Sequence, residues 1–136
     1  MAVFGENNYV QTVAIYSVVV LSTVVFLAVF ELLTKYRNWQ EIKNGNLAVA
    51  LATGGKILGI ANIFRFATES GEPIFATIVQ GVFGFILLLV GYFIFEFLTP
   101  TFKVDEEIEK GNAAVGFISM AISIGLSYVI GVSLNV

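Results

Sequence analysis

Two related stretches of sequence determine the fold. The first copy reads FELLTKYRNWQEIKNGNLAVALATGGKILGIANIF over residues 30–64, and the second reads FEFLTPTFKVDEEIEKGNAAVGFISMAISIGLSYVIG over residues 95–131. Matched positions differ by 65 at the start of the copies and by 66 from the shared Glu-Ile pair onward, so the second connector holds an extra residue. In each copy an apolar run ends at Phe-Glu, a charged connector follows, and Gly-Asn begins another apolar run. An internal repeat of this kind predicts two related halves.

The composition is that of a protein embedded in lipid. Of 136 residues, 57% are hydrophobic and 12% are charged, whereas soluble domains carry about 25% charged residues. The mean hydropathy is +0.89. Cys and His are absent, which excludes disulfides, thiol chemistry, Cys/His metal sites and a histidine base. We therefore expect an all-α integral membrane protein without cofactor or metal, and the sparse basic residues argue against nucleic-acid binding.

Four apolar runs, at about 10–33, 46–66, 74–98 and 112–134, are each long enough to cross a bilayer as a helix. The first run is too long for a signal-peptide core and no Lys or Arg precedes it, so we interpret it as a retained span. The sequence thus predicts one membrane domain over residues 1–136. It would consist of four transmembrane helices arranged as two parallel two-helix repeats, at about 10–66 and 74–134.

Basic residues predict the orientation in the membrane. The connectors 34–45 and 99–111 carry Lys35, Arg37, Lys43, Lys103 and Lys110. The opposite side has Arg65 at the end of a span and no basic residue in the N-terminal tail. The positive-inside rule then places both connectors in the cytoplasm and both termini outside. Under this orientation the first and third spans run in the same direction.

Lys56 is the most informative single residue. It lies ten residues into the second span, about 15 Å from its start, which predicts a position near the bilayer midplane. Ionisable residues at that depth are candidates for function. Gly55 and Gly59 form a GxxxG pattern that allows close helix approach, and Asn62 lies on nearly the same face. The alternative is a structural lysine, because the second copy has Ile122 at the matching position.

Glu31 and Glu96 occupy matching places near the cytoplasmic ends of the first and third spans. An unpaired carboxylate near a helix C-terminus is unfavourable, so we expect each to have a partner, either a basic side chain or the N–H groups that begin the second or fourth span. The functional alternative is a proton or cation site at the inner mouth.

Further polar residues fall within or beside the spans. Asn46 and Asn112, each after a glycine (Gly45 and Gly111), are predicted N-caps. The alternative is that the two helix starts meet and form an anion site.

In the fourth span, Ser123 belongs to a stripe of small residues typical of close helix packing, with a weakly polar path as the alternative. Gln80 should lie at a depth similar to that of Asn62, which suggests a hydrogen bond between the two. The charged run 105–110 is predicted to be solvated.

The paired motif resembles the DUF350 (UPF0719) family of small prokaryotic inner-membrane proteins. The residues that carry the resemblance are Glu41, Ile42, Gly45, Asn46, Ala48 and Val49, with Glu107, Ile108, Gly111, Asn112, Ala114 and Val115. The resemblance covers nearly the whole chain and implies a location in the prokaryotic cytoplasmic membrane. The family has no established activity, so no catalytic residue follows from it.

Two functions remain open from the sequence. The first is a membrane assembly or interaction component that binds a cytoplasmic protein through the two connectors. On this hypothesis Lys56→Met is tolerated or stabilising. The second is a small homo-oligomeric channel or transporter with Lys56, Asn62, Gln80 and Ser123 along its path. An enzyme is the least favoured class, because the residues for a nucleophile and base are nearly absent.

Overall fold

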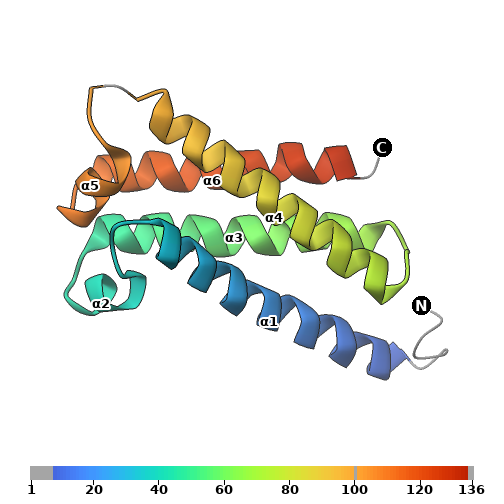
Figure 1. Ribbon diagram of the computed structural model, residues 1–136. Coiled ribbons are helices and arrows are strands. Elements are labelled where there is room, and N and C mark those ends of the chain that lie inside the picture. Colours follow the sequence, from blue (N-terminus) through green and yellow to red (C-terminus); the bar gives the residue numbers. More distant parts are fainter. Residues whose placement is uncertain (1–7, 100, 135–136) are drawn as a thin grey trace.

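The computed structural model describes residues 8–99 and 101–134, and these residues contain helices and no strand. The helices are α1 (Asn8–Leu33), α2 (Asn38–Lys43), α3 (Leu47–Glu69), α4 (Ile74–Phe97), α5 (Val104–Glu109) and α6 (Ala113–Leu134) (Figure 1). Four of them, α1, α3, α4 and α6, are long and apolar enough to cross a membrane. This confirms the predicted all-α fold with four spans. The N-terminal tail ahead of the first span, residues 1–7, lies outside the described residues.

Both connectors contain a short helix, which the sequence analysis did not predict. In α5, Val104 and Ile108 are fully buried, and they lie one turn apart. They form an apolar cluster at the connector end, together with Tyr36, Ala48, Val49, Ala52 and Val115. The prediction that the run 105–110 is solvated was therefore wrong in part, because this apolar side fixes α5 against the bundle and carries Asp105 inward with it.

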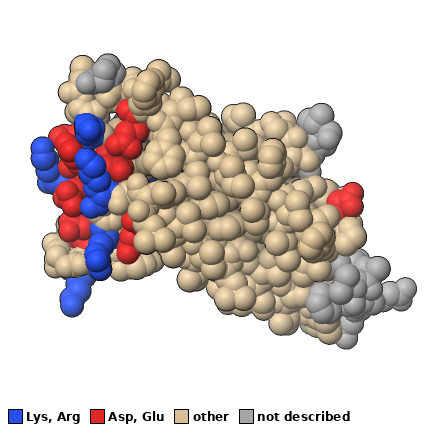
Figure 2. Space-filling model, in the orientation of Figure 1, with Lys and Arg blue, Asp and Glu red and all other residues tan. Residues whose placement is uncertain are grey.

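The long helices are arranged so that both connectors lie at one end of the molecule (Figure 1). The start of α1 and the end of α6 lie at the opposite end. The helices α1 and α4 run from that end toward the connectors, and α3 and α6 run back. The charged side chains gather mainly at the connector end, next to an almost uniformly uncharged body (Figure 2). This distribution suits a body in lipid with one charged end in water.

The helices α3 and α6 pack in close contact through small residues. A Cβ atom on Gly116 would lie 2.5 Å from the carbonyl oxygen of Ala48, and one on Gly55 would lie 2.6 Å from the Cα of Met120. A Cβ on Gly59 would lie 3.1 Å from the backbone oxygen of Ser123. The predicted packing role of the GxxxG pattern is confirmed, because side chains here would hold the two backbones apart.

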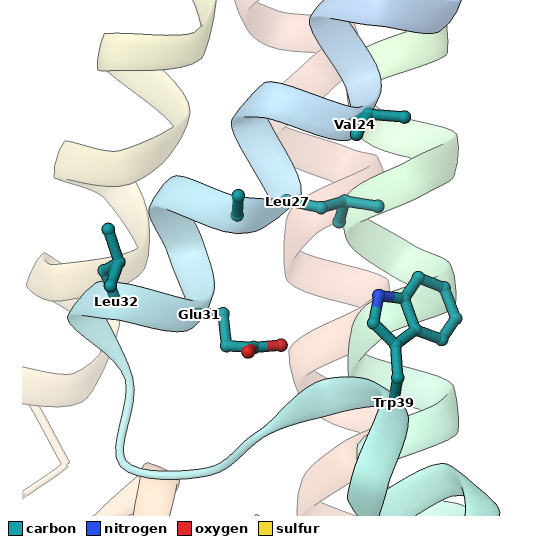
Figure 3. A pocket seen from close by; sticks show the side chains of 6 residues that line it. Val24, Leu27, Glu31, Leu32 and Trp39 are labelled. Carbon is teal, nitrogen blue, oxygen red and sulfur yellow. The ribbon is translucent and has the colours of Figure 1, made fainter.

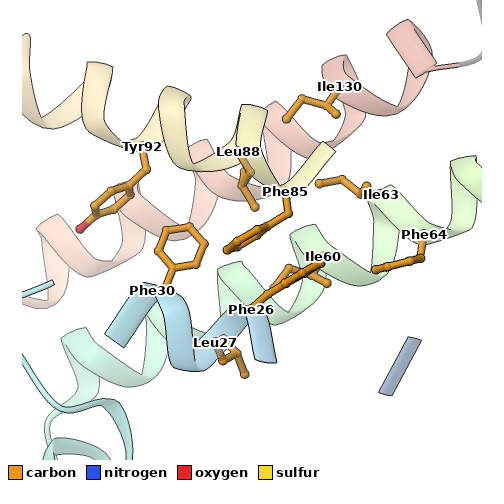
Figure 4. Packing of buried hydrophobic residues seen from close by; sticks show 10 residues of the cluster. All are labelled: Phe26, Leu27, Phe30, Ile60, Ile63, Phe64, Phe85, Leu88, Tyr92 and Ile130. Atoms are coloured by element: carbon orange, nitrogen blue, oxygen red, sulfur yellow. The ribbon is translucent and has the colours of Figure 1, made fainter. Parts of the chain in front are cut away.

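An aromatic cluster joins α1, α3 and α4 (Figure 4). The rings of Phe26 and Phe85 stack with centroids 4.0 Å apart, and Phe30 packs edge-on against Phe85 and Tyr92. Aromatic pairs in these geometries contribute about 0.5–1.5 kcal/mol beyond the area that they bury. The cluster ends at Tyr92, whose hydroxyl leads into the polar site described next.

Candidate functional site: a buried lysine network

Lys56 is enclosed by aromatic side chains from three elements. None of its surface is exposed. Its Nζ donates a hydrogen bond of 3.1 Å to the hydroxyl of Tyr36. The same Nζ lies 4.7 Å from the ring centroid of Phe30, 5.3 Å from that of Tyr36 and 5.1 Å from that of Tyr92. An ammonium enclosed in this way is stabilised by ring quadrupoles in place of water.

The ammonium group of Lys56 reaches toward the first connector. Side chains of an α-helix lean toward its N-terminus, and the start of α3 is at the connector end. The long lysine side chain therefore brings its charge to Tyr36 in the first connector. The expectation that Lys56 faces the bundle interior is confirmed by its burial, and its depth in the bilayer stays a prediction.

Two tyrosines connect Lys56 to a buried carboxylate. The rings of Tyr36 and Tyr92 both face the ammonium of Lys56, and Tyr92 donates to Oδ1 of Asp105 on α5. Because an ammonium can only donate, the Tyr36 oxygen accepts from Lys56, while the proton of Tyr92 points to Asp105. Burial raises the pKa of the Tyr36 phenol well above its ordinary value, so Tyr36 stays neutral beside Lys56.

Asp105 is the buried member of this network that the sequence did not reveal. Its exposed fraction is 4%, and it accepts from Tyr92, whose ring faces the Lys56 ammonium. A buried ammonium and a buried carboxylate compensate each other, whereas either alone would be strongly unfavourable. The signal that could have revealed it is the spacing of Val104 and Ile108, one turn apart in a charged run. That spacing predicts a short helix with a buried face.

Glu31 lies near the end of α1 and Glu96 near the end of α4. Their carboxylates approach the starts of the short connector helices α2 and α5. Oε2 of Glu31 accepts a 3.1 Å hydrogen bond from the backbone N–H of Asn38 at the start of α2. The carboxylate of Glu96 lies near the backbone of Asp105, in the first turn of α5, and near Lys35 and Lys103. For Glu31 the expected N–H partner at the start of α3 was therefore wrong, since the connectors were treated as loops without N–H groups of their own to satisfy.

The two Gly-Asn motifs form helix caps. Gly45 and Gly111 have φ angles of 86° and 90°, a conformation that glycine adopts without strain. Oδ1 of Asn46 accepts from the N–H of Val49 at 3.2 Å, and Oδ1 of Asn112 accepts from the N–H of Val115 at 3.4 Å. The predicted caps are confirmed.

The amide of Asn46 also joins the two halves of the chain. Its Nδ2 donates to the carbonyl oxygens of Ile108 and Glu109 and to Oε1 of Glu41, while Nδ2 of Asn112 donates to Oε1 of Glu107. The starts of α3 and α6 therefore do meet, but the amide of each capping asparagine already binds a carboxylate, Glu41 or Glu107. These negative charges argue against the alternative prediction, an anion site between the two helix starts.

The other predicted polar residues are not brought to Lys56. Nδ2 of Asn62 donates to Oγ of Ser127 at 3.0 Å, so the expected bond to Gln80 is absent. Within the described ranges, the buried Oε1 of Gln80 has no hydrogen-bond partner. Ser123 is buried and packs with its backbone against Gly59. Residues 8–99 and 101–134 contain no group of three acidic side chains placed to hold a metal ion.

Comparison with known proteins identifies the family. The model of DUF350, a domain of unknown function, matches residues 4–134. The UPF0719 transmembrane protein YshE of Bacillus subtilis (strain 168) is 59% identical over 130 residues, which are 96% of this chain and 97% of the relative. A UPF0719 transmembrane protein of Aquifex aeolicus (strain VF5) is 34% identical over 93 residues, 62% of this chain and 34% of the relative. No solved structure matches. The chain belongs to the DUF350 family of multi-pass transmembrane proteins.

Proposed function

We propose that this protein is a membrane assembly or interaction component without chemistry of its own, acting in the prokaryotic cytoplasmic membrane. The observation that carries the proposal is the enclosure of Lys56. Its surface is fully buried within the single chain, and its ammonium donates to Tyr36. A lysine that serves a solute path must face that path, whereas a lysine that locks helices together is sealed by its partners.

The connector end supplies the surface that such a component requires. Nζ of Lys35 in the first connector pairs with Oε1 of Glu106 in the second at 2.9 Å. The short helices α2 and α5 are fixed from below by the apolar cluster that includes Val104 and Ile108. The connector end is therefore a folded surface that carries charges of both signs (Figure 2). Such a surface suits recognition of a protein with complementary charge.

The proposal includes an orientation in the membrane. Five basic residues belong to the connectors at one end, and Arg65 lies near the end of α3, which runs to the other. By the positive-inside rule the connectors face the cytoplasm, both termini face outside, and the partner is a cytoplasmic protein. Homo-oligomerisation is also part of the proposal, since the outer apolar faces of the four long helices can be covered by lipid or by a second copy.

Site-specific photocrosslinking in cells tests the proposed function. A crosslinking residue at the exposed connector positions Lys43 or Lys110 should give a discrete adduct with one protein. The exposed apolar position Val90 serves as the matched control and should give no adduct with that protein. The adduct should disappear when Glu106 and Lys35 are exchanged for residues of opposite charge. Equal labelling from all three positions would contradict the proposal.

A small channel is the second candidate, because three side chains on the described parts of the four long helices carry a buried oxygen without a hydrogen-bond partner. These are Thr53, Gln80 and Ser119, and polar atoms of this kind are rare in a sealed core. Ion flux through liposomes separates the candidates. Flux that depends on Gln80 and Ser119 would favour the channel, and no flux above that of empty liposomes would favour the assembly component.

A further inference from the structure

A pocket opens at the junction of α1 and α2, outside the lysine network. It encloses about 430 Å³ and is lined by Val24, Leu27, Ala28, Glu31, Leu32 and Trp39. Glu31 extends from α1 toward the side where Trp39 stands on α2 (Figure 3). The remaining walls are aliphatic. The pocket therefore combines an apolar slot with a single carboxylate at the charged end of the molecule.

The carboxylate of Glu31 retains the capacity to bind a cation. Its Oε2 accepts from the backbone N–H of Asn38, and its Oε1 has no hydrogen-bond partner in the described ranges. No basic side chain of these ranges forms an ion pair with Glu31 either. A partly buried carboxylate without a counter-charge attracts a group that brings positive charge and N–H donors.

The second half of the chain provides an internal contrast. The corresponding pocket of about 540 Å³ is lined by Phe93, Glu96, Phe97, Thr99, Phe102 and Lys103. Here Lys103 brings a positive charge to the same pocket as Glu96, and the aromatic ring of Phe93 stands where Ala28 stands in the first copy. The second pocket thus holds a basic side chain beside its glutamate, whereas no basic side chain lines the first.

We infer that the pocket at Glu31 binds a phospholipid with a primary-ammonium headgroup. The ammonium would donate to Glu31, and an acyl chain would lie along Val24 and Leu27. Trp39 is 59% exposed, and its indole N–H is free to donate to the lipid phosphate, as suits an aromatic residue at the membrane interface. The inference concerns a lipid site and does not depend on the proposed function.

Native mass spectrometry of protein released from nanodiscs tests this inference. The nanodiscs would contain phosphatidylglycerol mixed with either phosphatidylethanolamine or phosphatidylcholine. The wild type should retain one phosphatidylethanolamine in preference to phosphatidylcholine. In Glu31→Gln this retention should fall about tenfold, because a charge-assisted hydrogen bond is lost. The amide oxygen can still accept from Asn38, so α2 keeps its position.

Two further variants keep the test decisive. Ala28→Phe introduces the residue of the second copy and should reduce retention by filling the slot while Glu31 remains. Glu96→Gln is the matched control and should retain the lipid as the wild type does. Equal retention by wild type and Glu31→Gln, or equal retention of the two lipids, would overturn the inference. Loss of a protein dimer in Glu31→Gln with unchanged lipid retention would overturn it in favour of a second copy as the occupant.

Discussion

The two halves of the chain share a sequence motif but contribute opposite charges to the buried network. The first half provides the ammonium of Lys56, where the second half has Ile122. The second half provides the carboxylate of Asp105, where the first half has Trp39. Each half also adds one tyrosine, Tyr36 from the first and Tyr92 from the last turns of α4. The caps and the positive-φ glycines occur in both halves. The asymmetric residues therefore hold the two halves to each other, while the paired motifs form the caps of both halves and add one contact between them, from Asn46 to α5.

Separating the two buried charges should have the largest effect. Lys56→Met leaves Asp105 uncompensated in its enclosure, and Asp105→Asn leaves Lys56 uncompensated. Each single change should lower the free energy of unfolding by about 3–5 kcal/mol, and the double variant should recover most of that loss. Reversible denaturation in detergent micelles measures the free energy of unfolding of the single and double variants.

Ile122→Met in the second half is the matched control and should cost less than about 1.5 kcal/mol. The presence of Asp105 thus reverses the expectation, drawn from sequence alone, that Lys56→Met is tolerated. A Lys56→Met variant as stable as the wild type would show that the two charges are not coupled.

Two glycine-to-alanine substitutions distinguish the contribution of the α3–α6 contact to stability from that of helix propensity. Gly116→Ala places a methyl group against the backbone of Ala48 and should destabilise the protein by about 1–3 kcal/mol. A Cβ on Gly125 meets nothing within 4 Å, so Gly125→Ala should be neutral or stabilise by up to about 1 kcal/mol. Thermal unfolding in nanodiscs compares the two. Equal effects would mean that the two helices can move apart at no cost.

The two caps should differ in their contribution to stability. Loss of either cap costs about 1 kcal/mol. Asn46→Ala also removes the bonds to the carbonyl oxygens of Ile108 and Glu109, so it should cost about 1 kcal/mol more than Asn112→Ala. Chemical denaturation of both variants in one detergent tests this difference. If Asn112→Ala proves the more harmful, the contact from Asn46 to α5 does not stabilise the assembly of the two halves.

The long elements could be predicted from the sequence because they depend on local properties. A run of about 20 apolar residues has one solution in lipid, and Gly-Asn before such a run specifies a cap wherever the helix packs. Lys56 could be predicted to face the bundle for a similar reason, since an ammonium is unfavourable against lipid.

The partners of these residues could not be predicted, because they come from distant parts of the chain. The network depends on α5 folding back so that Asp105 reaches Tyr92, and charge density alone favoured a solvated loop. Asn62 pairs with Ser127 rather than Gln80 because α3 packs so closely on α6. Contacts of this kind follow from helix rotation and register, which a hydropathy pattern leaves open.

The smallest effect is expected from the exposed bridge between the connectors. The hydrogen bond between Lys35 and Glu106 raises the pKa of the lysine and lowers that of the glutamate. The contribution of Glu106 is therefore present above its unfolded pKa and is lost as pH falls through its lower folded value. That of Lys35 is present below its unfolded pKa and is lost as pH rises through its higher folded value.

Stability from this pair should consequently be constant around neutral pH and decline toward both extremes, and added salt should weaken it. Melting curves of wild type and Lys35→Met across pH and salt measure this. A difference that persists unchanged in high salt would show that Lys35 acts through packing of its aliphatic stem. In that case the contact between the two halves at the surface is apolar, as it is in the cluster beneath α2 and α5.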